Sequence, residues 1–538
     1  MNNHWRNDHT KVSKKVSEYY AFYDVCFSHL QILSNKRGGN MNTETTLQTD
    51  IVVVGAGNAA LCAAIAAREQ GKDVIVLEKA PKKEMGGNSY YTHGSIRFAY
   101  RNEEDIKSII PDLSEEQLSM TDFGSYPAEQ FYDDLITLTE YKTDPELASV
   151  LADQSFATMK WLVSHNVRFV PIYGRQAFKI DGKFKFWGGM VVEAIGGGPG
   201  LVAQLYTAAK NLGISFYFNA MATKLLHDDR GVYGVVYKQN GQTKTIHAQA
   251  VILASGGFHA NTEMRARYLG EKWDVATVRG SRYNTGDGIR MALEIGAMPH
   301  GHWSGAHAVC IDLNARDFQP DGQRLSFPFG IMVNAHGERF VDEGADFRNY
   351  TYAKIGKLIL EQPGQLAWQI FDRKTLHLLR DEYKGRTVTK VRANSLEELA
   401  RKLTGVEPEG FLRTVKEFNA AVQTDIPFNP NIKDGRGTKG LRIPKTNWAQ
   451  PIDEPPFEAY GVTCGITFTY GGLKINTRCE VHDLLNQPIP GLYAAGELVG
   501  GLFYFNYPGG AGLMAGSVFG KIAGEQAAKF ATKRLAYQ

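Results

Sequence analysis

The chain has 538 residues, which is long for one domain and predicts two or three structural units. Its composition of 43% hydrophobic and 22% charged residues is typical of a globular protein. The net charge of +3 gives no support to a nucleic-acid-binding surface, because Lys and Arg form no long run. The five cysteines lack CxxC spacing, so we expect reduced thiols, as in the cytoplasm, and no metal site.

Residues 1–44 are polar and basic and lack the apolar core of a signal peptide. Met41 stands shortly before the first strand signal, so we expect a flexible arm or an upstream start, with a targeting tail as the alternative. Every apolar run of the chain is interrupted well short of the length of about 18 residues that a membrane span needs, so no transmembrane segment is expected.

A dinucleotide-binding motif begins at Asp50. The stretch DIVVVGAGNAALCAAIAAREQGKDVIVLEKA predicts a strand, a glycine turn, a small-residue helix and a second strand that ends in Glu78. Gly55, Gly57 and Ala60 fit the pattern G-x-G-x-x-G/A, in which the glycines allow the turn and the approach of a pyrophosphate. Glu78 is placed to accept hydrogen bonds from ribose hydroxyls.

Further glycine-rich segments favour FAD over NAD. GGNSYYTHGS (86–95) predicts a loop along an extended cofactor, and AVILASGGF (250–258) and GLYAAGELVGG (491–501) predict strands that end in glycine turns. The stretch AIGGGPGLVAQLYTAAKNLG lacks a small residue in register and predicts a helix start instead of a second nucleotide motif. Segments this far apart suit a long cofactor that crosses one sheet.

Seven stretches carry a resemblance to a known family: GAGNAALCAAIAARE, GGNS, ILASGGF, YNTGDGIRMALEIGA, GIMVNAHGERFVDEGADFRNYTYAKIG, VTCGITFTYGGLKIN and GLYAAGELVGGLFYFNYPGGAGLMAG. The chain resembles the flavoprotein subunits of the fumarate reductase and succinate dehydrogenase superfamily over residues 49–533. Within it the chain is most similar to FAD-dependent tricarballylate dehydrogenases, with 3-ketosteroid dehydrogenases as more distant relatives.

The resemblance implies an α/β fold in which a Rossmann-like FAD-binding domain is interrupted by an α+β capping domain. We expect the FAD-binding domain at 45–304 and 457–538 and the cap at 305–456, where SLEELARKL and PEGFLRTVKEFNAAV predict helices.

The resemblance also implies non-covalent FAD, because no histidine stands beside Asn88 and Ser89. The expected FAD contacts are Gly55, Gly57, Asn58, Ala59, Glu78, Lys79, Gly87, Asn88, Ser89, Gly94, Ala222, Asp287, Glu497, Gly512 and Leu513. For Asp287 the alternative is an N-cap on a helix at 288–296. We expect YPGGAGLMAGS to form a turn beneath the flavin, with a helix that starts near Leu513 and stabilises negative charge on reduced flavin.

The substrate-binding motif departs from that of fumarate reductases. Those enzymes hold a dicarboxylate with a histidine and an arginine, and this sequence has Phe468 and Tyr507 at the matching positions. A tyrosine before Pro-Gly also resembles 3-ketosteroid dehydrogenases, whereas ERFVDEGADFRNYTYAK and WSGAHAV resemble tricarballylate dehydrogenases.

The resemblance makes Arg348 the expected proton-transfer residue, with Tyr507 and Tyr470 as alternative bases. A guanidinium is a difficult base because it stays protonated, so Arg348 is alternatively a bidentate carboxylate clamp. His307 is expected to orient a carboxylate or to titrate, with a packed loop histidine as the alternative. Arg175 and Arg279 are further candidate carboxylate partners.

The predicted function is FAD-dependent dehydrogenation of a saturated C–C bond next to carboxylates, with tricarballylate as substrate and cis-aconitate as product. The alternatives are a 3-ketosteroid dehydrogenase, a fumarate or enoate reductase, or a flavin-binding protein without enzymatic activity. The resemblance implies a membrane-bound iron–sulfur electron-transfer partner and a cytoplasmic location, peripheral to the inner face of the membrane through that partner. Nucleic acid is not expected as a partner.

Overall fold

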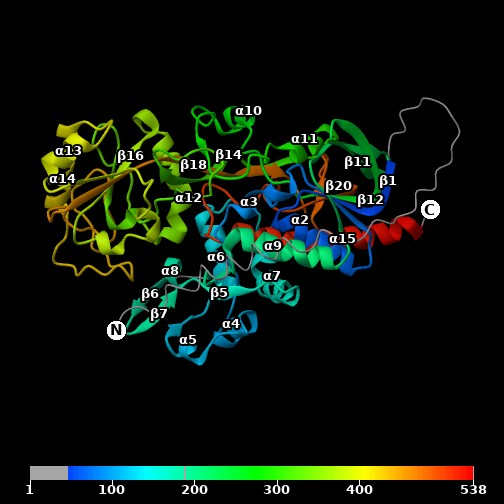
Figure 1. The fold of residues 1–538 in the computed structure, drawn as a ribbon, viewed down its shortest axis with the longest axis horizontal. Helices are drawn as coiled ribbons and strands as arrows, with labels where there is room; N and C mark the ends of the chain where they lie inside the picture. Colours follow the sequence, from blue (N-terminus) through cyan, green and yellow to red (C-terminus); the bar gives the residue numbers. More distant parts are fainter. Residues whose placement is uncertain (1–45, 187–188, 321, 537–538) are drawn as a thin grey trace. The chain divides into compact units, whose positions relative to one another are not determined.

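The computed structural model describes residues 46–186, 189–320 and 322–536 (Figure 1). The predicted arm at 1–44 lies outside the described residues. An eight-stranded sheet carries the dinucleotide motif, with β1 parallel to both β2 and β12, and β20 parallel to β12. Its strands are β1 (Thr46–Val54), β2 (Val74–Leu77), β9 (Ser215–Tyr217), β10 (Ala220–Asp228), β11 (Gly231–Gln239), β12 (Gln242–Leu253), β19 (Glu480–His482) and β20 (Pro488–Ala494).

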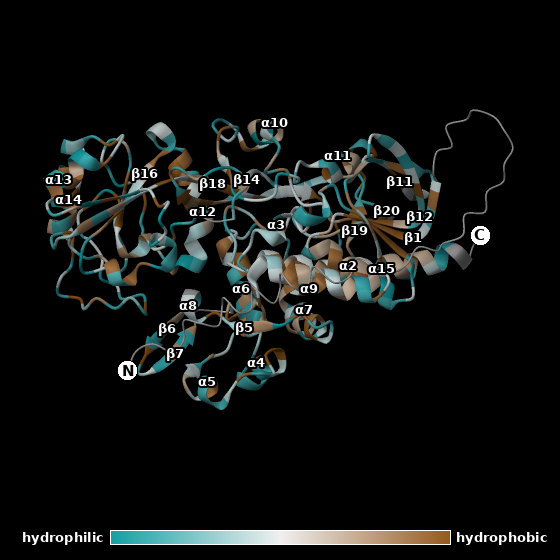
Figure 2. Ribbon diagram, viewed as in Figure 1, coloured by the Kyte–Doolittle hydropathy of each residue, from teal (hydrophilic) through white to brown (hydrophobic). Residues whose placement is uncertain are grey.

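Unbroken apolar runs explain the parallel part of this sheet. The residues at 51–54, 74–77 and 250–253 are buried on both faces of their strands, as parallel strands covered by helices require. Figure 2 shows the hydrophobic colouring of β1 and β12. The strand–turn–helix–strand prediction at Asp50 is confirmed by β1, α2 (Asn58–Glu69) and β2. The predicted helix start is also confirmed, by α9 (Gly197–Asn211).

Helix α15 (Ala511–Ala536) packs against α2 beside this sheet (Figure 1). Gly516, Gly520 and Gly524 repeat every four residues and therefore lie on one face of α15. A side chain at Gly520 would overlap the carbonyl of Ala59, and one at Gly524 that of Ala63. The small residues thus let the two backbones touch, which brings the start of α15 next to the glycine turn before α2.

A six-stranded sheet is organised around β18 (Phe457–Leu473), which pairs with four of its neighbours. The other strands are β13 (Thr277–Val278), β14 (Pro299–Asp312), β15 (Ile331–Val333), β16 (Ala367–Phe371) and β17 (Lys390–Ala393). Helix α12 (Arg348–Leu360) packs on β14 and β18, and the predicted helices α13 (Leu396–Lys402) and α14 (Pro408–Ala421) are confirmed. The proposed domain limits fall inside β14 and directly before β18, and the division itself stays a prediction.

Shorter elements complete the described chain. Two three-stranded sheets consist of β3 (Ser95–Ile96), β8 (Val192–Ala194) and β5 (Phe169–Pro171), and of β4 (Thr121–Asp122), β7 (Lys183–Phe186) and β6 (Ala177–Ile180). The remaining α-helices are α3 (Gly87–Tyr90), α4 (Glu103–Ile109), α5 (Glu115–Ser119), α6 (Ala128–Leu138), α7 (Pro145–Ser164), α8 (Tyr173–Gln176), α10 (Thr262–Met264) and α11 (Asp287–Glu294). In the described ranges no helix combines the length and hydropathy needed to cross a membrane. The predicted α/β fold class is confirmed by the sheet and helices around the dinucleotide motif.

Candidate functional site

One cavity brings together nearly all of the sequence-predicted site residues. Its lining includes Gly55, Gly57, Asn58, Ala59, Glu78, Lys79, Gly87, Asn88, Ser89, Ala222, Asp287, His307, Arg348, Tyr470, Glu497, Tyr507, Gly512 and Leu513. Gly94 does not line it. A side chain at Gly94 would lie 2.6 Å from the carbonyl carbon of Gly197, so this glycine serves the close packing of two backbones.

The glycine turn after β1 forms one end of the cavity. Gly55 has φ +111°, and a side chain there would overlap the carbonyl of Ala254 at the end of β12. Glu78 is buried beside the turn, and its two carboxylate oxygens accept hydrogen bonds from the amides of Ala56 (2.8 Å) and Ala80 (2.7 Å). Burial raises the pKa of Glu78. A carboxylate has about four lone-pair sites, so a ribose hydroxyl can still bond to it.

Lys79 and Asp287 join two segments that are far apart in the sequence. The Lys79 ammonium lies 2.8 Å from the Asp287 carboxylate, and Asp287 also accepts from the Thr285 hydroxyl at 2.7 Å. The alternative in which Asp287 is an N-cap is wrong, because Gly286 holds that position and Asp287 is the first residue of α11. This ion pair ties α11 to the end of β2.

Asn88 and Ser89 lie in the short helix α3, where the sequence predicted a loop, and their side chains hold this segment in place. The amide of Asn58 donates to the Ser89 hydroxyl (3.0 Å), at the start of α2. The Asn88 side chain donates to the Thr467 carbonyl (2.8 Å) and to Glu497 (3.1 Å), and accepts from the amide of Ser281. The predicted FAD contacts Asn88 and Glu497 therefore bond each other, and Asn88 connects α3 to β18.

Buried polar atoms without a partner converge on this cavity. The hydroxyls of Ser255, Thr467 and Tyr470 and both ring nitrogens of His307 make no hydrogen bond to the described residues, and all four side chains line the cavity. Such groups are costly inside a protein unless a ligand or water satisfies them. Together with the glycines at 55 and 57, which leave room for phosphates at the start of α2, these residues fit FAD.

The turn before α15 forms another part of the cavity lining. Helix α15 begins at Ala511, two residues before the predicted start at Leu513, and Gly510 precedes it with φ +83°. Arg97 fixes this turn, because its buried guanidinium donates to the Gly509 carbonyl (2.7 Å) and to the Tyr126 hydroxyl (2.9 Å). Sequence reasoning missed Arg97, since nothing near it in the chain marks a contact with a turn more than 400 residues away.

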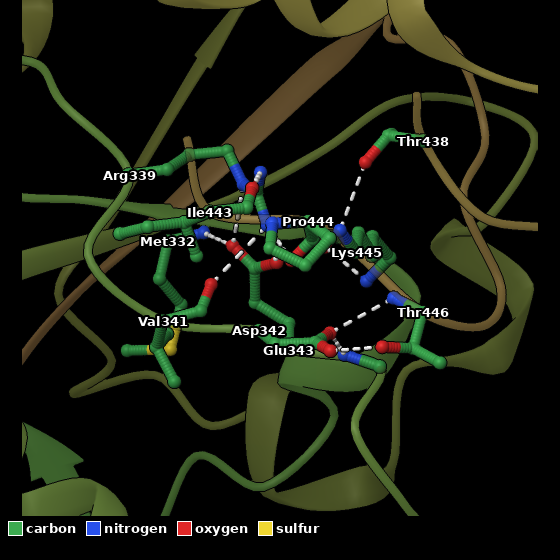
Figure 3. Close-up of polar contacts among 12 residues, drawn as sticks. Met332, Arg339, Val341, Asp342, Glu343, Thr438, Ile443, Pro444, Lys445 and Thr446 are labelled. Atoms are coloured by element: carbon green, nitrogen blue, oxygen red, sulfur yellow. Dashed lines mark hydrogen bonds and ion pairs between the residues drawn. The ribbon is translucent and has the colours of Figure 1, made fainter. Parts of the chain in front are cut away.

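Arg348 is the first residue of α12, and a buried ion pair fixes the segment before it. Arg339 and Glu343 form two hydrogen bonds of 3.1 and 2.6 Å, and Glu343 also accepts from the amide of Met332 (Figure 3). Lys445 lies beside the pair and donates to the carbonyls of Pro328 and Gly330. Both partners of the pair are buried, and they anchor the segment that leads into α12.

Five ring side chains form an aromatic wall of the cavity: His307, Tyr352, Phe468, Phe503 and Tyr507. His307 of β14 and Phe468 of β18 are a cross-strand pair, so their rings stack with centroids 5.0 Å apart. The Tyr352 and Tyr507 rings meet His307 edge-on, and the two tyrosine hydroxyls are 2.7 Å apart. Sequence reasoning missed Tyr352, although it lies one helical turn after Arg348.

The aromatic wall is uncharged. Burial, assisted by the positive charge of Arg279, lowers the pKa of His307 to about 3, so the imidazole is neutral at physiological pH. Burial raises the pKa of both Tyr470 and Tyr507 well above 10, which keeps their hydroxyls protonated. The tyrosines are therefore suited to donate hydrogen bonds and poorly suited to act as bases near neutral pH.

Besides Lys79, which is paired with Asp287, the cavity is lined by the cationic side chains of Arg279 and Arg348. The buried Arg279 donates to the carbonyls of Pro320 (3.1 Å) and Tyr91 (3.0 Å), which hold its guanidinium in place. The side chain of Arg175 lies outside the described part of the chain.

Comparisons with known proteins agree with this geometry. The chain matches the FAD binding domain family over residues 50–513. It is 33% identical over 497 residues to a probable fumarate reductase, Ifc3, of Shewanella frigidimarina, a match that covers 90% of this chain and 75% of the relative. It is similar to a flavocytochrome c3 fumarate reductase in its open conformation, with TM-score 0.67 and 28% identity over 99% of this chain and 83% of that one.

A 3-ketosteroid-Δ4-(5α)-dehydrogenase from Rhodococcus jostii shares the fold, with TM-score 0.67 over 91% of this chain and 99% of that one, at 24% identity. The predicted superfamily and the predicted cofactor are thus confirmed. This chain belongs to the FAD-binding flavoproteins of the fumarate reductase and succinate dehydrogenase superfamily, and it is an FAD-dependent oxidoreductase.

Proposed function

We propose that this enzyme interconverts a carbon–carbon single bond and a double bond next to a carboxylate. The observation that carries the proposal is the position of Arg348, which lines the same cavity as the glycine turns and the aromatic wall. An arginine guanidinium is the side chain best matched to a carboxylate, because it donates two parallel hydrogen bonds. The relationship to fumarate reductases supports the same chemistry.

Each part of the cavity has a role in the proposal. FAD, when bound, supplies the acceptor or donor of two electrons. The turns at Gly55 and Gly57 and the carboxylate of Glu78 would hold its phosphates and ribose, and the turn before α15 would lie against its flavin end. Arg348 binds the substrate carboxylate and exchanges a proton at the carbon next to it, while the aromatic wall excludes water.

The protonation state of Arg348 favours the reductive direction. A guanidinium is the protonated form of arginine, so Arg348 can donate a proton in reduction, where the enolate-like carbon is a stronger base than neutral guanidine. Oxidation would instead need Arg348 to be deprotonated first. Tyr470 and Tyr507, the alternative bases, would also have to lose a proton first, and burial makes that harder because it raises their pKa values. We therefore propose that Arg348 is the acid in reduction of an unsaturated acid.

The oxidation of tricarballylate to cis-aconitate is a second candidate. The observation that favours it is the presence of two arginines, Arg279 and Arg348, in one cavity, since a polyacid needs more than one cationic partner. The shared fold of the 3-ketosteroid dehydrogenase and the phenol of Tyr507 keep a ketone substrate as a further alternative. The iron–sulfur electron partner, the cytoplasmic location and its attachment to the membrane stay predictions.

Anaerobic flavin spectroscopy tests the proposal. The FAD-loaded enzyme is photoreduced and mixed with one candidate substrate, and the return of flavin absorbance is timed. The candidates are fumarate, cis-aconitate, cinnamate, 4-hydroxycinnamate and a 3-ketosteroid with a ring double bond. In a separate experiment, oxidised enzyme is mixed with tricarballylate and the loss of flavin absorbance is followed. We expect at least one unsaturated acid to reoxidise the flavin. Arg348→Lys should slow that step at least about 100-fold. Arg230→Lys, in the exposed turn between β10 and β11, is the matched control. Reaction with the steroid alone would contradict the proposal.

A further inference from the structure

We propose that the substrate is an unsaturated monocarboxylate whose double bond carries a planar, uncharged ring, which binds against the aromatic wall defined above. This inference rests on the proposed function and names the substrate class of the same site. It concerns the part of the substrate beyond the carboxylate that Arg348 holds.

The first support is the composition of the wall. Phe468 contacts three other members, with ring centroids 5.0 Å from His307, 5.2 Å from Tyr507 and 6.2 Å from Phe503. Tyr507 in turn lies 5.3 Å from Phe503 and bonds Tyr352. The rings are thus a continuous surface, and a flat ring gains contact area and edge-to-face interactions from such a surface.

The second support is the lack of a partner on the wall for a second carboxylate. His307 is neutral, and the hydroxyl of Tyr507 is already shared with Tyr352. Of the other cations in the lining, Lys79 is paired with Asp287, and carbonyls hold two nitrogens of Arg279. A second carboxylate against these uncharged rings would lose its hydration without a charged partner among the five wall residues, which is unfavourable.

The third support is a set of buried polar atoms in the cavity lining. The side chains of His307 and Tyr470 are 3% and 2% exposed, and both imidazole nitrogens and the Tyr470 hydroxyl have no partner among the described residues. These groups are neutral donors and acceptors, so they match a hydroxyl or a ring nitrogen better than a charged group. A polar substituent on the substrate's ring would satisfy them.

Calorimetric titration of the oxidised, FAD-loaded enzyme tests this binding without turnover. The probes are cinnamate, 4-hydroxycinnamate, fumarate and cis-aconitate. We expect 4-hydroxycinnamate to bind at least 10-fold more tightly than fumarate or cis-aconitate, and more tightly than cinnamate, because only its hydroxyl can bond the buried polar atoms. His307→Phe keeps the ring stack and removes both nitrogens, so it should abolish the difference between 4-hydroxycinnamate and cinnamate.

His247→Phe is the matched control, because His247 also stacks on an aromatic ring, that of Tyr233, but does not line the cavity. If His307→Phe fails to fold, Tyr470→Phe provides the second variant, with an expected loss of affinity for 4-hydroxycinnamate alone. Tighter binding of cis-aconitate or fumarate than of 4-hydroxycinnamate would overturn the inference. The proposed function would survive that result if either acid reoxidised the reduced flavin, and it would fail if none of the four acids did.

Discussion

At the scale of single residues, the burial of His307 has a consequence for stability. Its pKa is lowered to about 3 in the folded chain, from an ordinary value of 6.5, because the ring is buried between aromatic side chains. Below pH 6.5 the unfolded chain binds a proton that the folded chain does not. The free energy of unfolding therefore falls as the pH falls from 6.5 towards 3, by about 1.4 kcal/mol for each pH unit well below 6.5.

We predict that His307→Phe makes the flavin-free protein less sensitive to acid. Between pH 6.5 and pH 5 its unfolding free energy should fall by about 2 kcal/mol less than that of the unaltered chain, because one protonation site is absent. Thermal or denaturant unfolding at the two pH values measures the difference. His247→Phe serves as the control, and an equal loss in the His307→Phe chain and the unaltered chain would show that His307 is already accessible to protons in the folded state.

At the scale of elements, the start of α12 depends on a contact outside that helix. Glu343 stands five residues before Arg348 and accepts from both Arg339 and the amide of Met332, while its own side chain is fully buried (Figure 3). Removing one partner of a buried ion pair leaves the other charge uncompensated, which typically costs about 3–5 kcal/mol.

We predict that Glu343→Gln lowers the unfolding free energy by about 3 kcal/mol. It should also slow reoxidation of the reduced flavin by the substrate, since Arg348 loses its fixed position, while leaving the FAD content nearly unchanged. Denaturant unfolding and flavin absorbance measure the two effects. Glu407→Gln is the control, because Glu407 pairs with His336 at the surface. A stable Glu343→Gln protein with normal reoxidation would contradict this role of the pair.

At the scale of the whole molecule, sequence patterns predict those elements whose structure is determined by residues close together in the chain. The β1–α2–β2 unit, α9, α13 and α14 follow from hydrophobic periodicity and glycine positions within a few residues of each element. Arg97 and Tyr352 were not predictable in this way, because their roles depend on contacts with Gly509 and Tyr507, which lie far along the chain. The ion pair of Asp287 with Lys79 likewise joins two segments that are far apart in the sequence.

The same long-range assembly shapes how the molecule should respond to its cofactor. The cavity takes lining from the turn after β1, from α3, and from the segment at 496–516 near the other end of the chain. Helices α13 and α14 belong instead to a separate hydrophobic core with β15 and β16, built around Leu399, Phe411 and Phe418.

We predict that loading FAD slows amide hydrogen exchange in all three cavity segments together, and slows it little in α13 and α14. The reason is that one ligand bonded to segments from both ends of the chain must be released before either segment can open, whereas the separate core gains no new contact. Hydrogen-exchange mass spectrometry of the flavin-free and FAD-loaded forms measures this.

The flavin-free form in the same buffer is the reference for both comparisons. Protection confined to the turn after β1 would mean that the C-terminal turn before α15 does not hold the cofactor, and equal protection of α13 and α14 would mean that the two cores open as one unit.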